Sequence, residues 1–259
     1  ENPFTKIMNQ IGYDYFNLGN HDFNHGEEIL MDHIHKLNMP CLTANVLYKG
    51  EPLGKPYQII KTAGKTIALF GVTTHYVPNW EKPENIAHLT FMDALSCAKD
   101  ICSQIKEKEK ADYVIGVYHG GFEADPVSGA STEKQNGENQ GYQMCAQIDN
   151  LDVLLLGHQH RPMLGKCHNT IYIQSPHNGK EISFIEIDPE NDHIEAKSIP
   201  VDEQSDPDIL NLMKEEENAC QKWLDQPLGK SLTDLKIKDE FDARLHKSQV
   251  ITFLNDVCF

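Results

Sequence analysis

The sequence predicts an α/β protein whose sheets contain both parallel and antiparallel strands, and three observations support this. Up to residue 160, amphipathic segments with a helical period alternate with short apolar segments that are typical of strands. Beyond that point, strand-like segments follow one another without a helix between them, which makes the sheets mixed. Three of the apolar segments also end in glycine and histidine, so their ends can meet at one edge of a sheet.

Hydrophobic periodicity, together with the positions of glycine and proline, places the elements of the first part of the chain. In order, they are a helix over residues 3–12, a strand over 13–19, a helix over 26–38, and strands over 40–46 and 65–74. His33 and His35 lie two positions apart on the second of these helices and therefore face different directions. We expect both of them to face solvent.

The second part begins with the longest helical pattern, over residues 91–111, which leads into a strand over 112–121. A polar, glycine-rich segment over 128–141 then precedes a helix that ends near Asn150. The remaining elements are strands over 151–160, 170–176 and 181–188, and a helix over 206–225 that begins at an Asp-Pro pair.

Composition limits the partners of the chain. Its 259 residues are 39% hydrophobic and 24% charged, which is typical of a globular protein with a substantial core. The formal charge of −16 argues against a nucleic-acid partner. No apolar run approaches the roughly 20 residues that span a bilayer, so we expect no membrane span. Seven cysteines without a C-x-x-C pair predict mostly buried, reduced thiols.

The three strands that end in glycine and histidine are the strongest functional signal. Their ends carry Gly19, Asn20 and His21 in the first case, His119, Gly120 and Gly121 in the second, and Gly157, His158, Gln159 and His160 in the third. Loops at the carboxyl ends of strands in an open α/β sheet converge on the ligand-binding edge. Imidazole nitrogens and an amide oxygen suit zinc, manganese or iron. The three loops together predict a metal site, although each alone is more often a surface histidine.

The motifs GNHD, YHGGFE and GHQH, in this order, resemble the calcineurin-like metallophosphatases, and within them the nucleotidase branch. The resemblance covers nearly the whole chain and implies a four-layer αββα sandwich with mixed sheets, here lacking its first strands. It also implies a binuclear-metal phosphoesterase whose two divalent ions are manganese, zinc or iron. Carried over by position, Asn20, His119 and His158 would bind one ion, His160 would bind the other, and His21 would be the catalytic histidine.

The family's Asp-x-His and Gly-Asp motifs, the second of which supplies a bridging carboxylate, come before the first helix, and this sequence begins after them. We therefore expect an internal piece of a longer protein that holds at most one ion weakly. By the same resemblance, residues 1–204 form an N-terminally incomplete metallophosphatase domain, 205–228 a linker helix, and 229–259 the start of a C-terminal nucleotide-binding domain.

Asn24 is the residue that bears most directly on the substrate. The 5′-nucleotidase branch has Asp at this position, whereas GNHDFNHG, VPNWEKPEN and GENQGY resemble the 2′,3′-cyclic-nucleotide 2′-phosphodiesterases. We expect a small-molecule nucleotide substrate, and a 2′,3′-cyclic-nucleotide 2′-phosphodiesterase/3′-nucleotidase first. The alternative enzyme is a 5′-nucleotidase or UDP-sugar hydrolase, and the family favours a periplasmic, cell-wall or secreted location.

Other classes are less well supported. A metallo-β-lactamase-like hydrolase would need a His-x-His-x-Asp-His run and a zincin protease a His-Glu-x-x-His motif, and the sequence contains neither. The non-enzyme alternative is a catalytically silent scaffold that retains half of a metal centre. The sequence assigns no substrate-binding residue and no oligomeric state.

Overall fold

The computed structural model describes residues 2–202, 204–237, 239–246 and 248–258. The chain separates into two compact units, and the boundary falls between Leu212 and Met213, inside helix α5 (Pro207–Leu224). The three-part division into 1–204, 205–228 and 229–259 stays a prediction.

The first unit is built on a sheet of six strands in the order β3-β4-β6-β7-β9-β8. These strands are β3 (Gln58–Thr62), β4 (Lys65–Thr73), β6 (Tyr113–His119), β7 (Val153–Leu156), β9 (Thr170–Gln174) and β8 (Met163–Cys167). The four central strands pair in parallel, and the two edge strands pair antiparallel to their neighbours. The prediction of a mixed α/β fold is confirmed.

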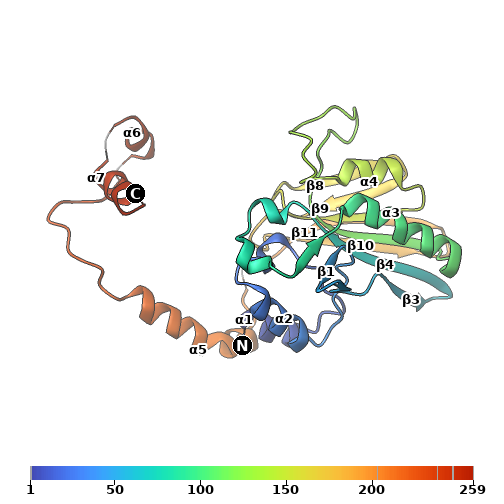
Figure 1. Cartoon of the computed structure of the whole chain (residues 1–259), viewed down its shortest axis with the longest axis horizontal. Coiled ribbons are helices and arrows are strands. Elements are labelled where there is room, and N and C mark those ends of the chain that lie inside the picture. The colour runs from blue at the N-terminus through green and yellow to red at the C-terminus, as the bar shows by residue number, and fades with distance from the viewer. Residues whose placement is uncertain (1, 203, 238, 247, 259) are drawn as a thin grey trace. The chain divides into compact units, whose positions relative to one another are not determined.

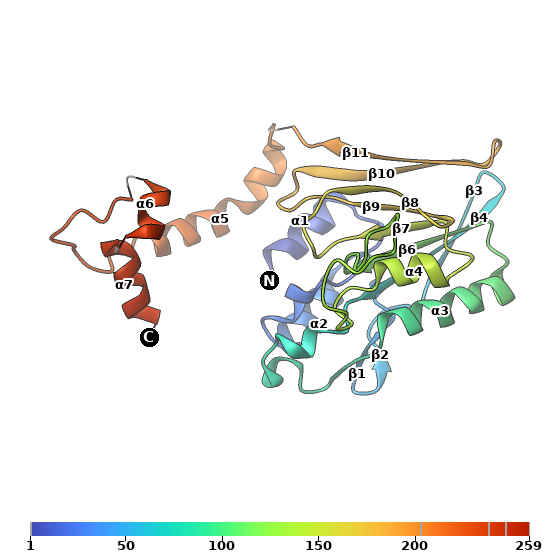
Figure 2. The same ribbon diagram turned by 90° about the horizontal axis from the view of Figure 1, so that it is seen from above.

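Helices cover one face of this sheet and a β-hairpin covers the other (Figures 1 and 2). Helices α3 (Ala94–Gln104) and α4 (Gly141–Gln147) lie on the first face, where they bury Phe70, Val72, Ala98, Ile101, Tyr118, Met144 and Leu154. On the second face, β10 (Glu181–Asp188) pairs antiparallel with β11 (His193–Pro200). The hairpin reaches across the sheet to β6, since the Tyr113 hydroxyl donates to Asp192 at 2.8 Å.

The helix expected over 91–111 begins later and changes form before it ends. Leu89–Phe91 is a strand, β5, and the Asp93 side chain accepts from the Ser96 N–H at 2.8 Å, which caps α3. After α3, residues Ile105–Glu109 form a π-helical turn that closes at Lys110, whose φ is 51°. The segment over 91–111, whose pattern predicted one long helix, therefore contains the end of a strand, a helix cap, an α-helix and a π-helical turn.

The segments before β3, together with those between β4 and α3, form a second, smaller core. Its elements are α1 (Pro3–Ile11), η1 (Asn20–Phe23), α2 (Glu27–Lys36), the sheet β2-β1-β5 with β1 (Val46–Tyr48) and β2 (Glu51–Pro52), and the short helices η2 (Val77–Asn79) and η3 (Pro83–Ile86). Leu18, Phe23, Leu30, Val46 and Val77 are buried together at its centre. This core fixes η1, and with it Asn20 and His21, against the edge of the main sheet.

The strands expected over 13–19 and 40–46 are extended segments joined by isolated bridges rather than ladders. Phe16 pairs with Cys41 and Thr43 pairs with Gly71, both in parallel. The reason is a side-chain hydrogen bond: the Leu18 N–H donates to Thr43 Oγ1 at 2.8 Å, so the donor that would continue the ladder is satisfied elsewhere. Val46, the last residue of the second segment, begins β1 instead.

The expectation that His33 faces solvent is wrong, whereas His35 is exposed as expected. His33 is only 4% exposed, its Nδ1 lies 2.7 Å from the hydroxyl of buried Thr5, and its ring meets that of Phe16 edge-on. Burial lowers the pKa of His33, and the nearby carboxylates of Asp22 and Asp32 oppose this in part. The two histidines do face different directions, as their spacing predicted, but α1 covers His33.

The second unit contains the rest of α5, α6 (Glu240–Leu245) and α7 (Gln249–Cys258). Several of its apolar side chains are exposed, namely Leu228, Leu232, Phe241, Leu245, Phe253, Leu254 and Val257. Among the described residues, no helix is both long enough and apolar enough to cross a bilayer. All seven cysteines are free thiols, and Cys41, Cys102, Cys145 and Cys167 are buried.

The burial of His33 predicts a pH dependence of stability. Its pKa is lowered in the folded chain, so on acidification the unfolded chain takes up the proton first, and the free energy of unfolding falls as pH drops below about 6.5. His33→Gln removes this contribution and flattens the dependence between about pH 7.5 and 5.5. The measurement is urea unfolding in the presence of a chelator.

His35→Gln is the matched control, because His35 is exposed on the same helix. This variant should keep the wild-type slope. An unchanged slope in His33→Gln would contradict the assignment of the pH dependence to His33.

Candidate metal centre

The register of the parallel strands brings two of the three predicted loops together. Thr73 at the end of β4 pairs with His119 at the end of β6, and Tyr118 pairs with Leu156 at the end of β7. The Thr74 N–H then donates to the His119 carbonyl at 2.9 Å. Since β7 ends one residue before the level of His119, the loop that carries His158 begins beside His119.

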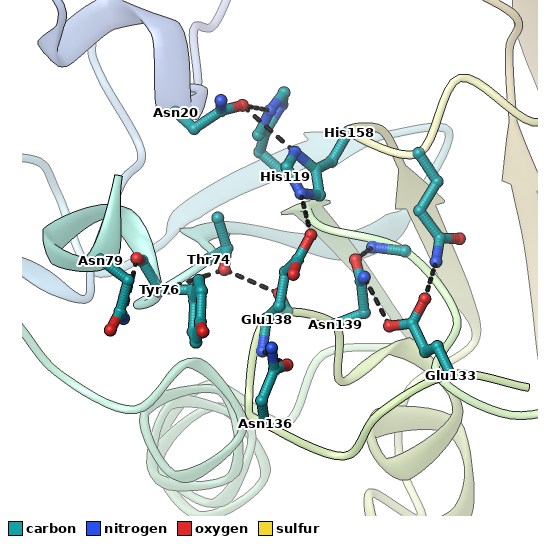
Figure 3. Close-up of polar contacts among 12 residues, drawn as sticks. Asn20, Thr74, Tyr76, Asn79, His119, Glu133, Asn136, Glu138, Asn139 and His158 are labelled. Atoms are coloured by element: carbon teal, nitrogen blue, oxygen red, sulfur yellow. Dashed lines mark hydrogen bonds and ion pairs between the residues drawn. The ribbon is translucent and has the colours of Figure 1, made fainter. Parts of the chain in front are cut away.

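Asn20 joins the two histidines from the opposite side, through η1. Its side-chain oxygen Oδ1 lies 2.8 Å from His119 Nε2 and 3.2 Å from His158 Nδ1 (Figure 3). The centroids of the two imidazole rings are 5.5 Å apart. The structure therefore brings Asn20, His119 and His158 together around one oxygen atom.

Both histidines are displayed by tight turns at the strand ends. The Gly120 N–H donates to the Tyr118 carbonyl at 3.0 Å, which places His119 at the centre of a three-residue turn. The Gln159 N–H donates to the Gly157 carbonyl at 2.8 Å, and His158 at the centre of that turn has a φ of 71°. This combination is typical of the strained classic γ-turn, which costs about 1–3 kcal/mol and is found mainly at functional sites.

Gly19 permits the close approach of η1 to β6. A Cβ atom on Gly19 would lie 2.8 Å from Cε1 of His119, closer than real Cβ atoms come to their neighbours. The Gly19 N–H also donates to the Asp22 carboxylate at 2.7 Å, so Asp22 braces the turn that carries Asn20. Burial raises the pKa of Asp22, and the hydrogen bond from Gly19 opposes that rise.

Electrostatics keep His119 neutral. Burial, followed by the nearby imidazoles of His158, His21 and His160, lowers the pKa of His119 to about 3. A neutral imidazole is the form that coordinates a metal ion. The positive charge that His21 and His160 carry when protonated therefore adds to the lowering of the His119 pKa.

His21 and His160 take separate positions. His21 Nδ1 lies 2.8 Å from Oδ1 of Asn24, on the exposed side of η1. His160 has a φ of 57°, and its ring centroid lies 5.6 Å from that of His177. Among the hydrogen bonds of the described residues, those to Asn20 Oδ1 come from His119 and His158, so the assignment of His160 to a second ion stays a prediction.

Glu138 contacts the site and was not singled out from the sequence. Its carboxylate lies 3.1 Å from Nε2 of His158, on the opposite side of the ring from Asn20 (Figure 3). Its carbonyl accepts from the Thr74 hydroxyl at 2.7 Å and from the Tyr118 hydroxyl at 3.1 Å. These contacts fix Glu138 between the ends of β4 and β6. The only sequence signal was its place in the GENQGY motif.

Glu123 and Asn139 support the backbone next to the site. Buried Glu123 accepts from the N–H groups of Tyr142 and Gln143 at 3.0 and 2.9 Å, so it caps the start of α4. Asn139 Oδ1 accepts from the Gly121 N–H at 2.6 Å. Both hydrogen bonds hold the loop that follows His119.

Comparison with known proteins assigns the chain to a family. The model of the family described as calcineurin-like phosphoesterase matches residues 2–162, which is more than half of the chain and includes all three loops. The chain belongs to the calcineurin-like phosphoesterase family. The resemblance found in the sequence is thereby confirmed.

Two relatives of this chain bear nucleotidase names. A 5′-nucleotidase of Vibrio cholerae is 34% identical over 171 residues, which cover 65% of this chain and 30% of the relative. A 2′,3′-cyclic-nucleotide 2′-phosphodiesterase/3′-nucleotidase of Yersinia enterocolitica is 29% identical over 180 residues, which cover 65% of this chain and 26% of the relative. The chain thus spans about 30% of the length of the curated relatives it matches.

Solved structures agree on the fold. The crystal structure of a Staphylococcus aureus protein provisionally named a 5′-nucleotidase, in complex with alpha-ketoglutarate, has a TM-score of 0.84 and 32% identity over 97% of this chain and 50% of that chain. The calcineurin-like phosphoesterase YfkN of Bacillus subtilis has a TM-score of 0.69 over 86% of this chain and 75% of its own. At 20% identity, the second likeness shows the fold alone.

The residues present fit a divalent ion, the kind of ion that calcineurin-like phosphoesterases generally use. Two imidazole nitrogens and one amide oxygen converge within 3.2 Å, and this donor set suits borderline metals such as zinc, manganese or iron. Glu138 holds the far nitrogen of His158, as carboxylates do for many metal-bound histidines. Among the described residues, no group of three or more His, Cys, Asp or Glu side chains gathers closely enough to hold an ion.

The Glu138 contact predicts a loss of metal affinity on mutation. Glu138→Gln removes the charge that orients His158, and partners of this kind typically contribute roughly 10–100-fold to affinity. We expect a loss of that size for manganese or zinc, measured by isothermal titration calorimetry. Glu51→Gln, at an exposed position in β2, is the charge-matched control and should bind as the wild type does. Equal affinities in both variants would refute the role of Glu138.

Proposed function

We propose that this chain forms the core of a metal-dependent phosphoesterase that hydrolyses nucleotides, most specifically a 2′,3′-cyclic-nucleotide 2′-phosphodiesterase/3′-nucleotidase. The observation that carries the proposal is the convergence of Asn20, His119 and His158 at the carboxyl ends of two parallel strands in a chain of this family. Asn24, in place of the aspartate of the 5′-nucleotidase branch, supports the cyclic-nucleotide substrate. A 5′-nucleotidase or UDP-sugar hydrolase is the second candidate, because the Vibrio cholerae relative bears the first of these names.

The proposed centre holds two divalent ions of manganese, zinc or iron. Asn20, His119 and His158 would bind one ion, and His160 would contribute to the other. When bound, such a pair neutralises charge on the phosphoryl oxygens and generates a nucleophile from water at neutral pH. This local positive charge also suits a phosphate substrate to a chain whose net charge is −16.

His21 is proposed to act on the leaving-group side of the phosphorus. Its Nδ1 is engaged by Asn24 at 2.8 Å, which leaves Nε2 for the substrate. As the bond between phosphorus and the 2′ ribose oxygen breaks, Nε2 gives its proton to that oxygen, and the product is a 3′-nucleotide. General acid catalysis of this kind typically contributes about 10²–10⁴-fold.

The proposed location is extracytoplasmic, in the periplasm, the cell wall or the medium, on the strength of family membership. The proposed partner is a small nucleotide rather than a nucleic acid, in keeping with the acidic charge of the chain.

The proposed substrate predicts an order of rates. The protein should hydrolyse 2′,3′-cyclic AMP, and then the resulting 3′-nucleotide, faster than it hydrolyses 5′-AMP. Initial rates at equal substrate concentrations decide between the two branches. A preference for 5′-AMP by about tenfold, equivalent to about 1.4 kcal/mol of transition-state binding, would favour the 5′-nucleotidase instead.

The neighbours Asn20 and His21 should respond differently to mutation. Asn20→Ala removes a proposed metal ligand and should lower both metal content and turnover. His21→Ala should keep the metal and lower turnover by roughly 10²–10⁴-fold, the contribution of a general acid. Metal content is measured by mass spectrometry on both purified variants. Loss of metal from His21→Ala would contradict the assignment, and absence of turnover in the wild type would indicate a silent scaffold.

A further inference from the structure

His21 is linked to a carboxylate that lies far from it in the sequence. Its Nδ1 lies 2.8 Å from Oδ1 of Asn24, and Nδ2 of Asn24 donates to Oε2 of Glu81 at 2.6 Å. The Asn24 amide therefore stands between an imidazole on its oxygen side and a carboxylate on its nitrogen side. Glu81 follows η2, 57 residues away from Asn24 along the chain.

Glu81 is itself held by further hydrogen bonds, so it can fix the orientation of the Asn24 amide. Its other oxygen, Oε1, accepts from the Lys82 N–H and from the Asn85 side chain, both at 2.8 Å. Asn85 also donates to the Asn24 carbonyl at 2.9 Å, which ties the two loops together. Burial alone would raise the pKa of Glu81, but the hydrogen bonds from Asn24, Lys82 and Asn85 lower it, so the group is a carboxylate at neutral pH.

The direction of each hydrogen bond follows from the chemistry of these groups. An ionised carboxylate can only accept, so the side of Asn24 that faces Glu81 must be its NH₂ group. The oxygen of Asn24 then faces His21 and can only accept, so Nδ1 of His21 must carry a proton. The neutral imidazole that results has its lone pair on Nε2.

We propose that Glu81 is a positioning residue, which fixes the Asn24 amide and thereby holds His21 in the tautomer that leaves Nε2 free to take up and deliver the transferable proton. This inference rests on the proposed function of His21. An aspartate at position 24 could accept from Nδ1–H of His21 and carry the negative charge itself. In this chain the negative charge is on Glu81, and the Asn24 amide between them fixes the orientation of His21.

Glu81→Gln should reverse the chain of hydrogen bonds. Oε1 receives two N–H donors, so the glutamine keeps its oxygen there and turns its NH₂ group toward Asn24. Two NH₂ groups cannot face each other, so Asn24 turns over and presents its own NH₂ group to His21. Nδ1 must then accept, and the proton of the neutral ring moves to Nε2.

Nitrogen-15 NMR of the ring nitrogens tests this on the chain itself, free of metal and at a pH where His21 is neutral. The His21 signals are assigned by their loss in His21→Gln. We expect the Nδ1–H tautomer in the wild type and the Nε2–H tautomer in Glu81→Gln. A wild-type ring with its proton on Nε2, or an unchanged tautomer in Glu81→Gln, would overturn the proposal.

A charge-conserving swap provides the rescue. In the double variant Asn24→Asp with Glu81→Gln, the new aspartate accepts from Nδ1–H on one side and from the glutamine NH₂ group on the other, so the Nδ1–H tautomer should return. Glu84→Gln is the matched control, because Glu84 is an exposed carboxylate in the neighbouring helix η3 and should not change the tautomer. Failure of the swap to restore the tautomer would count against the transmission through residue 24.

Turnover of 2′,3′-cyclic AMP by the protein separates this inference from the proposed function. Glu81→Gln should lower kcat by roughly tenfold or more, within the limit set by His21→Ala, and the swap should restore it. Bis(p-nitrophenyl) phosphate, whose leaving group needs no proton, should be affected much less by Glu81→Gln. No effect of His21→Ala on the cyclic nucleotide would refute the proposed function, whereas a tautomer change without a change in kcat would refute only the role of Glu81.

Discussion

The parallel register of β4, β6 and β7 is the constraint on which the site depends. Thr73 and His119 are paired at the ends of β4 and β6, and β7 ends at Leu156, which is paired with Tyr118. The chain therefore leaves the sheet three times along the same edge. The backbone groups freed there pair with one another, as in the hydrogen bond of 3.2 Å from the Gly157 N–H to the Gly120 carbonyl. The two histidines are therefore placed by the sheet, and η1 needs only to bring one amide to them.

The part of the site that lies on strand ends could be predicted from the sequence, because a strand that stops in glycine and histidine fixes where the side chain goes. His119 and His158 are such residues, and Asn20 was found because it follows an apolar segment in the same way. The segment before Asn20 is nevertheless not a ladder strand, since the hydroxyl of Thr43 takes the backbone donor of Leu18. Alternation of apolar residues cannot reveal a hydrogen bond of this kind.

The residues that the sequence did not reveal are those whose partners lie in other loops. Glu138 meets His158 and Glu81 meets Asn24 through loop conformations that are set by local turns and by side-chain hydrogen bonds, which leave no periodic pattern. His33 illustrates the same limit in a helix, because its burial depends on α1 lying across it, with Thr5 as its partner. In each case the sequence can indicate the local direction of the side chain. The residues that contact it depend on tertiary packing.

The contacts of Glu138 have a further consequence for the loop between β6 and α4. That loop is joined to His158 through the Glu138 carboxylate, to Thr74 through its carbonyl, and to the backbone of Gly121 through Asn139. Any ligand that restricts the motion of the His158 ring also restricts the motion of Glu138, because the two side chains share a hydrogen bond. Amide hydrogen exchange and protease cleavage in residues 123–140 would then slow as the centre fills, so the loop reports occupancy without any turnover.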